Sequence, residues 1–468
     1  MSLNVLSGVR PIYRRLRGNA APVRVYEELY GDESFGFLYE SLEEQGSRGR
    51  FSFTGGRPRV VFKSKADRIE IRGGGEQHLL NGDPIDALRE LVRSATDALP
   101  IATFPGGAVG YFGYDVVRFM APVPDGNPDD LELPDAYFLF PEEVLIFDHL
   151  DEVVHILLYS ENDGSTRARE IEHVIAASEE SGPMPAAPAS GGPVAIQSNM
   201  TEEQFARMVE RTKEYIRAGD IYQGVLSQRF EFPITAGELQ IYKALRVTNP
   251  SPYMYYLNLD GLHVSGSSPE ILVKLTGRRV VTRPLAGTRP RGATEEEDRA
   301  LAAELHDDPK ERAEHVMLVD LARNDIGRDC GIGSVRVDQY LDIERYARVM
   351  HLVSNVVGRL RDDRDAFDLF RSTFPAGTVS GAPKVRAMQI IDELEPVKRG
   401  LYAGAIGYFS FLGDMDLCIA IRTIVARNGR GYLQVGAGIV ADSIPELEYQ
   451  ETLNKARGLI HAIHLASQ

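Results

Sequence analysis

Tryptophan is absent from the 468 residues, and the aromatic bulk comes from 20 tyrosines and 19 phenylalanines. Cys330 and Cys418 are the only cysteines, too few for a disulfide framework or a zinc site, which favours a reducing compartment. Positive charge is in deficit: 52 Lys and Arg against 68 Asp and Glu give a formal charge of −16. That balance argues against nucleic acid or an anionic membrane as a partner. No stretch approaches roughly 18 apolar residues, and residues 1–9 lack a signal-peptide pattern, so we expect a cytoplasmic globular protein.

The chain has ordinary globular composition, with 43% hydrophobic and 26% charged residues. Residues 181–198 differ from the rest, because they contain four prolines and no charged residue. Such a segment buries little surface and is typical of a linker. We therefore predict an N-terminal domain over residues 1–185, a linker over 186–198 and a larger domain over 199–468.

Strand-like and helical patterns mix irregularly along the chain, which favours an α+β fold with large mixed or antiparallel sheets over a regular βα repeat. After the linker, Thr201-Glu-Glu-Gln204 fits a capping box, and Gly219 marks the end of the helix that follows. Apolar runs predict strands over residues 60–63, 144–147, 153–158, 253–259, 271–275, 405–411 and 432–435.

Two predicted helices each present a pair of carboxylates. In the first, Asp307 or Asp308 can cap a helix on which Glu311 and Glu314 share one face. In the second, Ser443 can cap, Pro445 opens the helix, and Glu448, Glu451 and Lys455 share one face. Solvated acidic turns would give the same pattern. Carboxylate oxygens are nevertheless suitable ligands for Mg²⁺, which commonly takes one or two of them plus its substrate.

Two glycine-containing segments have the composition of anion-binding loops. Gly436-Ala437-Gly438 follows a predicted strand, as in a dinucleotide fingerprint, but Pro445 interrupts the expected helix and too little chain remains for a βαβ unit. A glycine loop that approaches an anion through backbone N–H groups stays possible. The segment from Gly377 and Thr378 to Lys384 leads into a helix start, which suits an anion or a plain loop-to-helix junction equally.

Two isolated residues are also candidates. His351 lies in a strand-like run, where a histidine is more often a core residue than a catalyst. Arg422 lies among apolar residues, and a buried arginine is costly unless it pairs with an anion such as a ligand carboxylate. Together, these residues favour a small polyanionic substrate bound beside Mg²⁺.

At these same residues the chain resembles the chorismate-utilising enzymes, most closely the anthranilate synthase component I branch. The resemblance covers nearly the whole chain. The matching strings are residues 219–230, 268–270, 283–292 and 308–327, together with the segments around Thr378, Gly436 and Glu448. It implies an α+β fold with a sandwich-like core of large mixed or antiparallel sheets flanked by helices. The implied reaction converts chorismate and ammonia to anthranilate and pyruvate, the first step of tryptophan biosynthesis.

The resemblance also implies a role for each matching residue. Mg²⁺ would be bound by Glu314 and Glu451, with Glu311 and Glu448 nearby through water. Glu270 would be the general acid, and His351 would assist proton loss and aromatisation. Chorismate would contact Gly287, Thr288, Thr378, Tyr402, Arg422, Gly436, Ala437, Gly438 and Lys455. The feedback inhibitor tryptophan would bind Glu40, Ser41, Pro252, Tyr253 and Met254 in the N-terminal regulatory half and its facing wall.

Two positions separate the relatives by nucleophile. Water-adding members carry a lysine where this chain has Gln223, and aminodeoxychorismate synthases typically carry one where it has Ala286. Lacking both, the chain matches the ammonia-using branch, and its two cysteines are not in a nucleophile context. A separate glutamine amidotransferase subunit, and hence a hetero-oligomer, is therefore implied. The alternatives are an enzyme that stops at 2-amino-2-deoxyisochorismate, an aminodeoxychorismate synthase component I and a non-catalytic tryptophan sensor.

Overall fold

The computed structural model describes residues 11–42, 49–94, 99, 104–160, 164–180, 194–345 and 349–467. Most of the predicted linker lies outside these ranges. Its last two residues form the short strand β9 (Gln197–Ser198), which pairs with a neighbouring strand. Within the described ranges, no helix combines the length and the apolar character needed to cross a membrane.

The described strands form one continuous network of 22 strands in which every pairing is antiparallel. It has two branches that share the long strands β3 (Phe51–Lys65) and β7 (Ala136–Asp148). The first branch runs in the order β1 (Ile12–Arg17), β8 (Val153–Leu158), β7, β3, β2 (Phe35–Glu40), β11 (Tyr253–Leu259), β12 (Leu262–Ser268), β21 (Thr423–Arg427), β22 (Arg430–Ile439) and β10 (Gln223–Pro233), with β9 and β18 (Gly381–Ala382) on β10. The second runs β5 (Glu76–Asn81), β4 (Arg68–Gly73), β3, β7, β6 (Gly107–Phe112), β19 (Ala405–Ser410), β20 (Met415–Ile419), β13 (Ile271–Thr276), β14 (Arg279–Thr282) and β17 (Val349–Arg359), with β15 (Leu285–Pro290) and β16 (Arg336–Arg345) on β17.

The branches separate where both shared strands carry a proline. Pro58 of β3 lies opposite Pro141 of β7, and the register shifts immediately afterwards, between Pro58 and Val60. Neither proline can donate a hydrogen bond to the ladder, so pairing is interrupted at this point. Before Pro58, β3 pairs with β2 of the first branch, and after it with β4 of the second. Before Pro141, β7 pairs with β6 of the second branch, and after it with β8 of the first.

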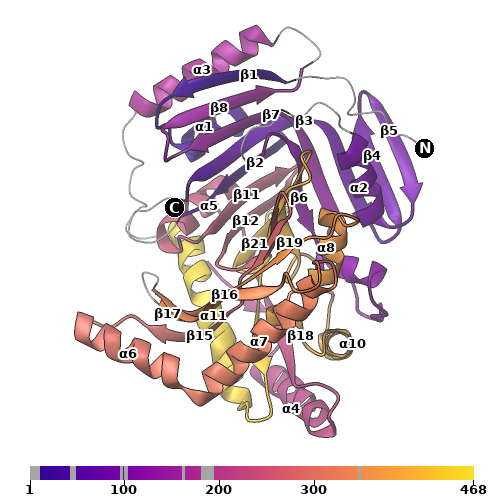
Figure 1. The fold of residues 1–468 in the computed structure, drawn as a ribbon, viewed down its shortest axis with the longest axis vertical. Helices are drawn as coiled ribbons and strands as arrows, with labels where there is room; N and C mark the ends of the chain where they lie inside the picture. The colour runs from indigo at the N-terminus through magenta and orange to yellow at the C-terminus, as the bar shows by residue number, and fades with distance from the viewer. Residues whose placement is uncertain are drawn as a thin grey trace.

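The branches face each other across an apolar layer, and helices cover both outer faces (Figure 1). Buried side chains such as Phe37 and Val264 of the first branch and Tyr111 and Ile406 of the second share the inner cluster. The outer face of the first branch packs on α1 (Pro22–Tyr30), α3 (Ser165–Glu180), α5 (Glu238–Thr248) and α11 (Pro445–Ala466). That of the second packs on α2 (Pro84–Ser94), the 3₁₀ helix η2 (Tyr114–Phe119), α7 (Pro309–Gly327), α8 (Ala366–Thr373) and α10 (Lys384–Leu394). The predicted α+β sandwich flanked by helices is confirmed.

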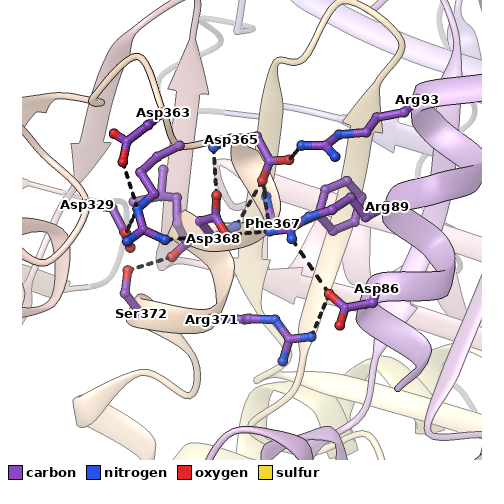
Figure 2. Close-up of polar contacts among 12 residues, drawn as sticks. Asp86, Arg89, Arg93, Asp329, Asp363, Asp365, Phe367, Asp368, Arg371 and Ser372 are labelled. Carbon is purple, nitrogen blue, oxygen red and sulfur yellow. Dashed lines mark hydrogen bonds and ion pairs between the residues drawn. The ribbon is translucent and has the colours of Figure 1, made fainter. Parts of the chain in front are cut away.

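Strands from the two predicted domains pair directly. In the first branch β2 pairs with β11, and in the second β6 pairs with β19. Helices α2 and α8 also join the two parts of the chain through ion pairs: Arg89 lies between Asp365 and Asp368, at 3.1 and 2.5 Å (Figure 2). Both aspartates belong to the capping box that starts α8, so the network fixes that helix end. The division into domains stays a prediction.

The predicted helix caps hold with one exception. Helix α4 (Glu202–Ala218) begins with the predicted capping box of Thr201 and Gln204 and ends at Gly219 in the left-handed conformation. Asp308 caps α7 by accepting from the backbone N–H groups of Lys310 and Glu311. The prediction that Ser443 caps α11 is wrong: the N-cap is Ile444, and Ser443 Oγ instead accepts from the N–H of Val440.

Candidate active site

The four predicted metal-binding glutamates lie on α7 and α11. Glu311 Oε1 is 3.1 Å from Arg289, and Glu451 Oε1 is 2.6 Å from Lys455. Glu314 accepts from Gln223 at 3.2 Å. Neither Glu314 nor Glu448 forms an ion pair within the described chain.

These carboxylates repel one another. Burial raises the pKa of Glu314, and Glu311 and Glu451 raise it further. Burial also raises the pKa of Glu448, with an added contribution from Glu451. Within the described ranges, no three His, Cys, Asp or Glu side chains are close enough together to hold a metal ion without other ligands. The oxygen donors and the excess negative charge fit Mg²⁺, which needs only one or two protein carboxylates besides substrate and water.

Glu270 lies in the link between β12 and β13, and its side chain is buried. It is 8% exposed, and Thr378 Oγ1 donates to its Oε1 at 2.9 Å. Burial raises the pKa of Glu270 to about 7, although the Thr378 hydrogen bond and the charge of Lys455 act in the opposite direction. A carboxyl group with that pKa is substantially protonated at neutral pH and suits a general acid.

His351 is oriented by a bulge in the neighbouring strand. The register between β15 and β17 shifts between Ala286 and Thr288, and Gly287 has a φ of +68°. The freed carbonyl of Gly287 lies 2.8 Å from Nδ1 of His351. A carbonyl only accepts, so Nδ1 carries the hydrogen and Nε2 carries the lone pair of the neutral ring. Burial lowers the pKa of His351, which keeps that ring neutral and able to act as a base.

Arg422 combines a charged side chain with a half-buried position. Its Nη1 donates to the carbonyl of Lys455 at 3.0 Å, and it forms no ion pair among the residues described. Burial lowers its pKa, whereas Tyr402 and Glu451 raise it. Burial raises the pKa of Tyr402 to about 12, and the charges of Arg422 and Glu270 both act on its hydroxyl. The described residues thus offer this guanidinium no carboxylate partner, and its pairing with a ligand carboxylate stays a prediction.

The segment Gly436–Gly438 is part of a strand, so the prediction of a glycine loop is wrong. β22 continues to Ile439, with Gly436, Ala437 and Gly438 opposite Ser227, Leu226 and Val225 of β10. On its other side, the pairing of β22 with β21 ends at Leu433. This open edge begins just before the glycines, and Lys455 Nζ donates to the Gly436 carbonyl there at 2.9 Å.

The five predicted inhibitor residues line one cavity of about 530 Å³, a size suited to a small molecule. Its walls include Tyr39, Phe53 and Tyr408. Tyr253 donates to Asp416 at 3.0 Å, and Lys274 pairs with the same carboxylate at 2.6 Å. The cavity-lining residues predicted for the inhibitor are Glu40, Ser41, Pro252, Tyr253 and Met254.

Glu40 is already engaged within this wall. Its carboxylate accepts from Tyr242 at 2.7 Å and from Arg246 at 2.9 and 3.1 Å. Any ligand amine would therefore meet a carboxylate whose charge is partly neutralised.

Comparisons of this chain with known proteins identify its family. A family model described as chorismate binding enzyme matches residues 37–461. Anthranilate synthase component 1 of Acetivibrio thermocellus is 46% identical over 463 residues, covering 96% of this chain and 93% of the relative. The chain belongs to this family. A crystal structure of anthranilate synthase component I from Streptococcus pneumoniae TIGR4 is 39% identical, with a TM-score of 0.79 over 96% of this chain and 99% of that one.

A more distant solved structure shares the fold. The menaquinone-specific isochorismate synthase MenF of Escherichia coli is 21% identical, with a TM-score of 0.71 over 98% of this chain and 97% of MenF. The relatives named here as anthranilate synthase component 1 do not favour the alternative assignments.

Sequence reasoning missed two supports of the site. Arg399 is buried between the rings of Tyr114 and Tyr402, at 4.9 and 5.3 Å. It also donates to Glu395 and to the carbonyls of Val379 and Val225. The spacing of Glu395 and Arg399, four residues apart, was an available signal. The second support is the partner of Lys384, described below.

Proposed function

We propose that the chain is the chorismate-aminating subunit of an anthranilate synthase, converting chorismate and ammonia to anthranilate and pyruvate. The observation that carries the proposal is the buried carboxyl group of Glu270, held by Thr378 and set within electrostatic reach of Tyr402 and Lys455. Glu270 and Arg422 both act electrostatically on Tyr402, and Arg422 also acts on His351, so an acid, a guanidinium and a neutral imidazole are near one another. These are the groups this reaction requires.

The first half of the reaction uses Glu270. The protonated carboxyl donates its proton to the C4 hydroxyl group, which leaves as water while ammonia forms the new bond at C2 and the ring double bonds shift. The new ammonium group then gives up one proton to solvent and becomes an amine. Arg422 and Tyr402 would hold the enolpyruvyl carboxylate, because the half-buried guanidinium has no anionic partner among the described residues. With the ring carboxylate held at the proposed Mg²⁺ site, both carboxylates of chorismate would be fixed. That would orient the region from C2 to C4 toward the carboxyl group of Glu270.

The second half uses His351. Nδ1 donates to the Gly287 carbonyl, so Nε2 is the atom that accepts the C2 proton. Removal of that proton makes the ring aromatic as the C3–O bond breaks, and the enolpyruvate that leaves takes up a proton to become pyruvate. Thr288 Oγ1, 3.0 Å from Nδ1, further limits rotation of the imidazole.

Glu314 and Glu451 would hold Mg²⁺, with Glu311 and Glu448 close by. When bound, the ion would neutralise and orient the ring carboxylate of chorismate. The mutual repulsion of these glutamates supports this assignment, since a divalent cation would relieve it.

Ammonia would come from a separate glutamine amidotransferase subunit. Burial raises the pKa of Cys330 to about 11 and also raises the pKa of the fully buried Cys418. Neither thiol is suited to form the thiolate that glutamine hydrolysis requires. The isolated chain should therefore use ammonium salts and not glutamine.

Tryptophan would bind in the 530 Å³ cavity and act on Glu270 through its neighbours. Pro269 and Ile271 line this cavity, whereas Glu270 between them lines a second one with Thr378. Ile271 and Arg283 line both. A ligand that shifts this wall would move the carboxyl group that the reaction uses.

The test incubates the purified chain with chorismate, MgCl₂ and ammonium, and follows products by mass spectrometry. Anthranilate with an equal amount of pyruvate supports the proposal. An amino acid that still carries the enolpyruvyl group, or no product in the presence of an active amidotransferase partner, refutes it. Glu451→Gln should lose turnover, while Glu446→Gln, an exposed change on the same helix, serves as the matched control.

A further inference from the structure

The threonine that holds Glu270 lies on a short connection between two helices. Residues 374–383 link α8 to α10 and contain α9 (Gly377–Ser380), a single turn that presents Thr378. A four-residue turn has little stability of its own, so its position depends on anchors outside it. Those anchors determine where Thr378 Oγ1 lies relative to Glu270.

Lys384 closes this connection at its base. Its Nζ donates to the carbonyl of Thr373, the last residue of α8, at 2.9 Å. The same nitrogen lies 2.7 Å from Oδ2 of Asp325 on α7. One side chain therefore joins the two ends of the connection to each other and to a third helix.

The Lys384–Asp325 pair is buried, and the charge of Lys384 is neutralised within the protein. The side chains of Lys384 and Asp325 are 12% and 9% exposed. The sequence left open an anion-binding loop in which this lysine would face a ligand, but its charge is used internally. Buried ion pairs are costly, and apolar replacements are often as stable, so stability alone gives a weak reason for one here.

Other contacts hold α8 and the later part of the connection separately, so Lys384 is the residue that links them. Helix α8 is fixed from outside by the network of Arg89, Asp365 and Asp368 (Figure 2). The later part of the connection is held separately, because Val379 accepts from Arg399 and β18 pairs with β10. Only the Lys384 contact among these joins the end of α8 to the start of α10.

The pair also lies next to the residue it would position. A small cavity of about 40 Å³ is lined by Asp325, Thr373, Thr378 and Glu270 together. Asp325 and Thr373, the two partners of Lys384, thus border the same small space as the Thr378–Glu270 hydrogen bond. A change at the base of the connection is therefore felt directly at the Thr378–Glu270 hydrogen bond.

We propose that the Lys384–Asp325 pair is a positioning device for the reaction: by joining Thr373 to Lys384, it holds Thr378 Oγ1 against Glu270. The inference rests on the proposed function, in which Glu270 is the general acid. Lys384 touches no reacting atom and acts only through Thr378.

The test compares Lys384→Met and Asp325→Asn with Thr378→Val in the ammonium-dependent assay. Displacement of a catalytic group by about 1 Å costs about 10²-fold, so we expect kcat to fall by that order with KM for chorismate nearly unchanged. Loss of the Thr378 donor raises the pKa of Glu270, so the alkaline limb of the pH–rate profile should move to higher pH in all three variants. Lys384→Arg, which keeps a donor and the charge, should recover part of kcat.

A double variant separates positioning from general damage. In the Thr378→Val background, Lys384→Met should cost little more, because the contact it supports is already gone. Arg167→Met, which breaks the Arg167–Glu143 pair in a distant part of the fold, should leave the pH profile unchanged. If Lys384→Met does not fold, Lys384→Met with Asp325→Met removes both buried charges together and takes its place.

Three results would overturn the inference. They are a Lys384→Met enzyme with the wild-type pH profile, full additivity with Thr378→Val, or an equal shift in Arg167→Met. Failure of the proposed function gives a different pattern: the wild-type chain would not aminate chorismate, or Glu270→Gln and Thr378→Val would turn over like wild type. That pattern would also remove the catalytic role of the pair.

Discussion

Glu270→Gln should make the protein more stable while it abolishes most of the activity. The buried carboxyl has its pKa raised from 4.5 to about 7, so ionising it in the folded state costs free energy. At about 1.36 kcal/mol for each pH unit, the full cost is about 3 kcal/mol. Glutamine is never ionised, and its carbonyl oxygen can still accept from Thr378.

The gain depends on pH in a defined direction. Between pH 4.5 and about 7 the folded state binds more protons at this group than the unfolded state, so stability falls as the pH rises. The advantage of Glu270→Gln should be about 3 kcal/mol at pH 8 and below about 1 kcal/mol at pH 5. With an unfolding entropy of about 1 kcal/mol/K for 468 residues, the melting temperature should rise by roughly 3 °C at pH 8.

The assay is thermal and urea unfolding of both proteins at pH 5 and pH 8, together with ammonium-dependent turnover. Loss of a general acid typically lowers kcat by about 10²–10⁴-fold. The exposed Glu446→Gln is the control and should change neither quantity. A Glu270→Gln protein that is no more stable at pH 8, or whose advantage persists at pH 5, would refute the argument that burial governs this carboxyl.

Three further predictions concern the other parts of the site. Glu314→Gln should raise the Mg²⁺ concentration for half-maximal turnover by at least about 10-fold in a metal titration, and an unchanged requirement would contradict the metal assignment. Ser41→Leu places bulk in the 530 Å³ cavity and should weaken tryptophan inhibition by at least about 10-fold, measured by inhibition curves, without altering uninhibited turnover. Gly436→Ala would put a Cβ 2.5 Å from Tyr402 Oη and 2.7 Å from the Leu226 carbonyl, so unfolding should show a loss of about 1–3 kcal/mol with a lower kcat/KM. Wild-type stability of Gly436→Ala would show that the strand moves to accommodate it.

Patterns that depend on nearby residues were predictable from the sequence. The capping box at Thr201 and the cap at Asp308 were recognised because both depend on side chains within three positions of the helix start. The wrong prediction at Ser443 was also made from nearby residues, which did not distinguish two possible start positions. Two residues precede Pro445 there, and the helix begins at the one without a side-chain cap, leaving Ser443 Oγ to bond backward to Val440.

Contacts between distant segments could not be predicted by spacing. The glycines 436–438 have the composition of a loop, but pairing with β10 holds them in a strand. Lys384 has the position of an anion-binding residue, but Asp325, 59 residues earlier, takes up its charge. For most of the remaining site, the resemblance to a family supplied roles that no local pattern carried.

The positions of Glu270 and Arg422 show why the site forms where it does. Glu270 lies where the chain passes from β12 of the first branch to β13 of the second, and Arg422 lies where it returns from β20 to β21. The two crossings run side by side, since Ile419 donates to the Glu270 carbonyl at 3.0 Å and Ser267 donates to that of Arg422 at 3.1 Å. A chain that changes branch must leave its ladder, and Arg422 does so with a φ of +52°. Irregular backbone at this seam turns a carboxyl and a guanidinium inward, where a regular strand of either branch would place apolar side chains.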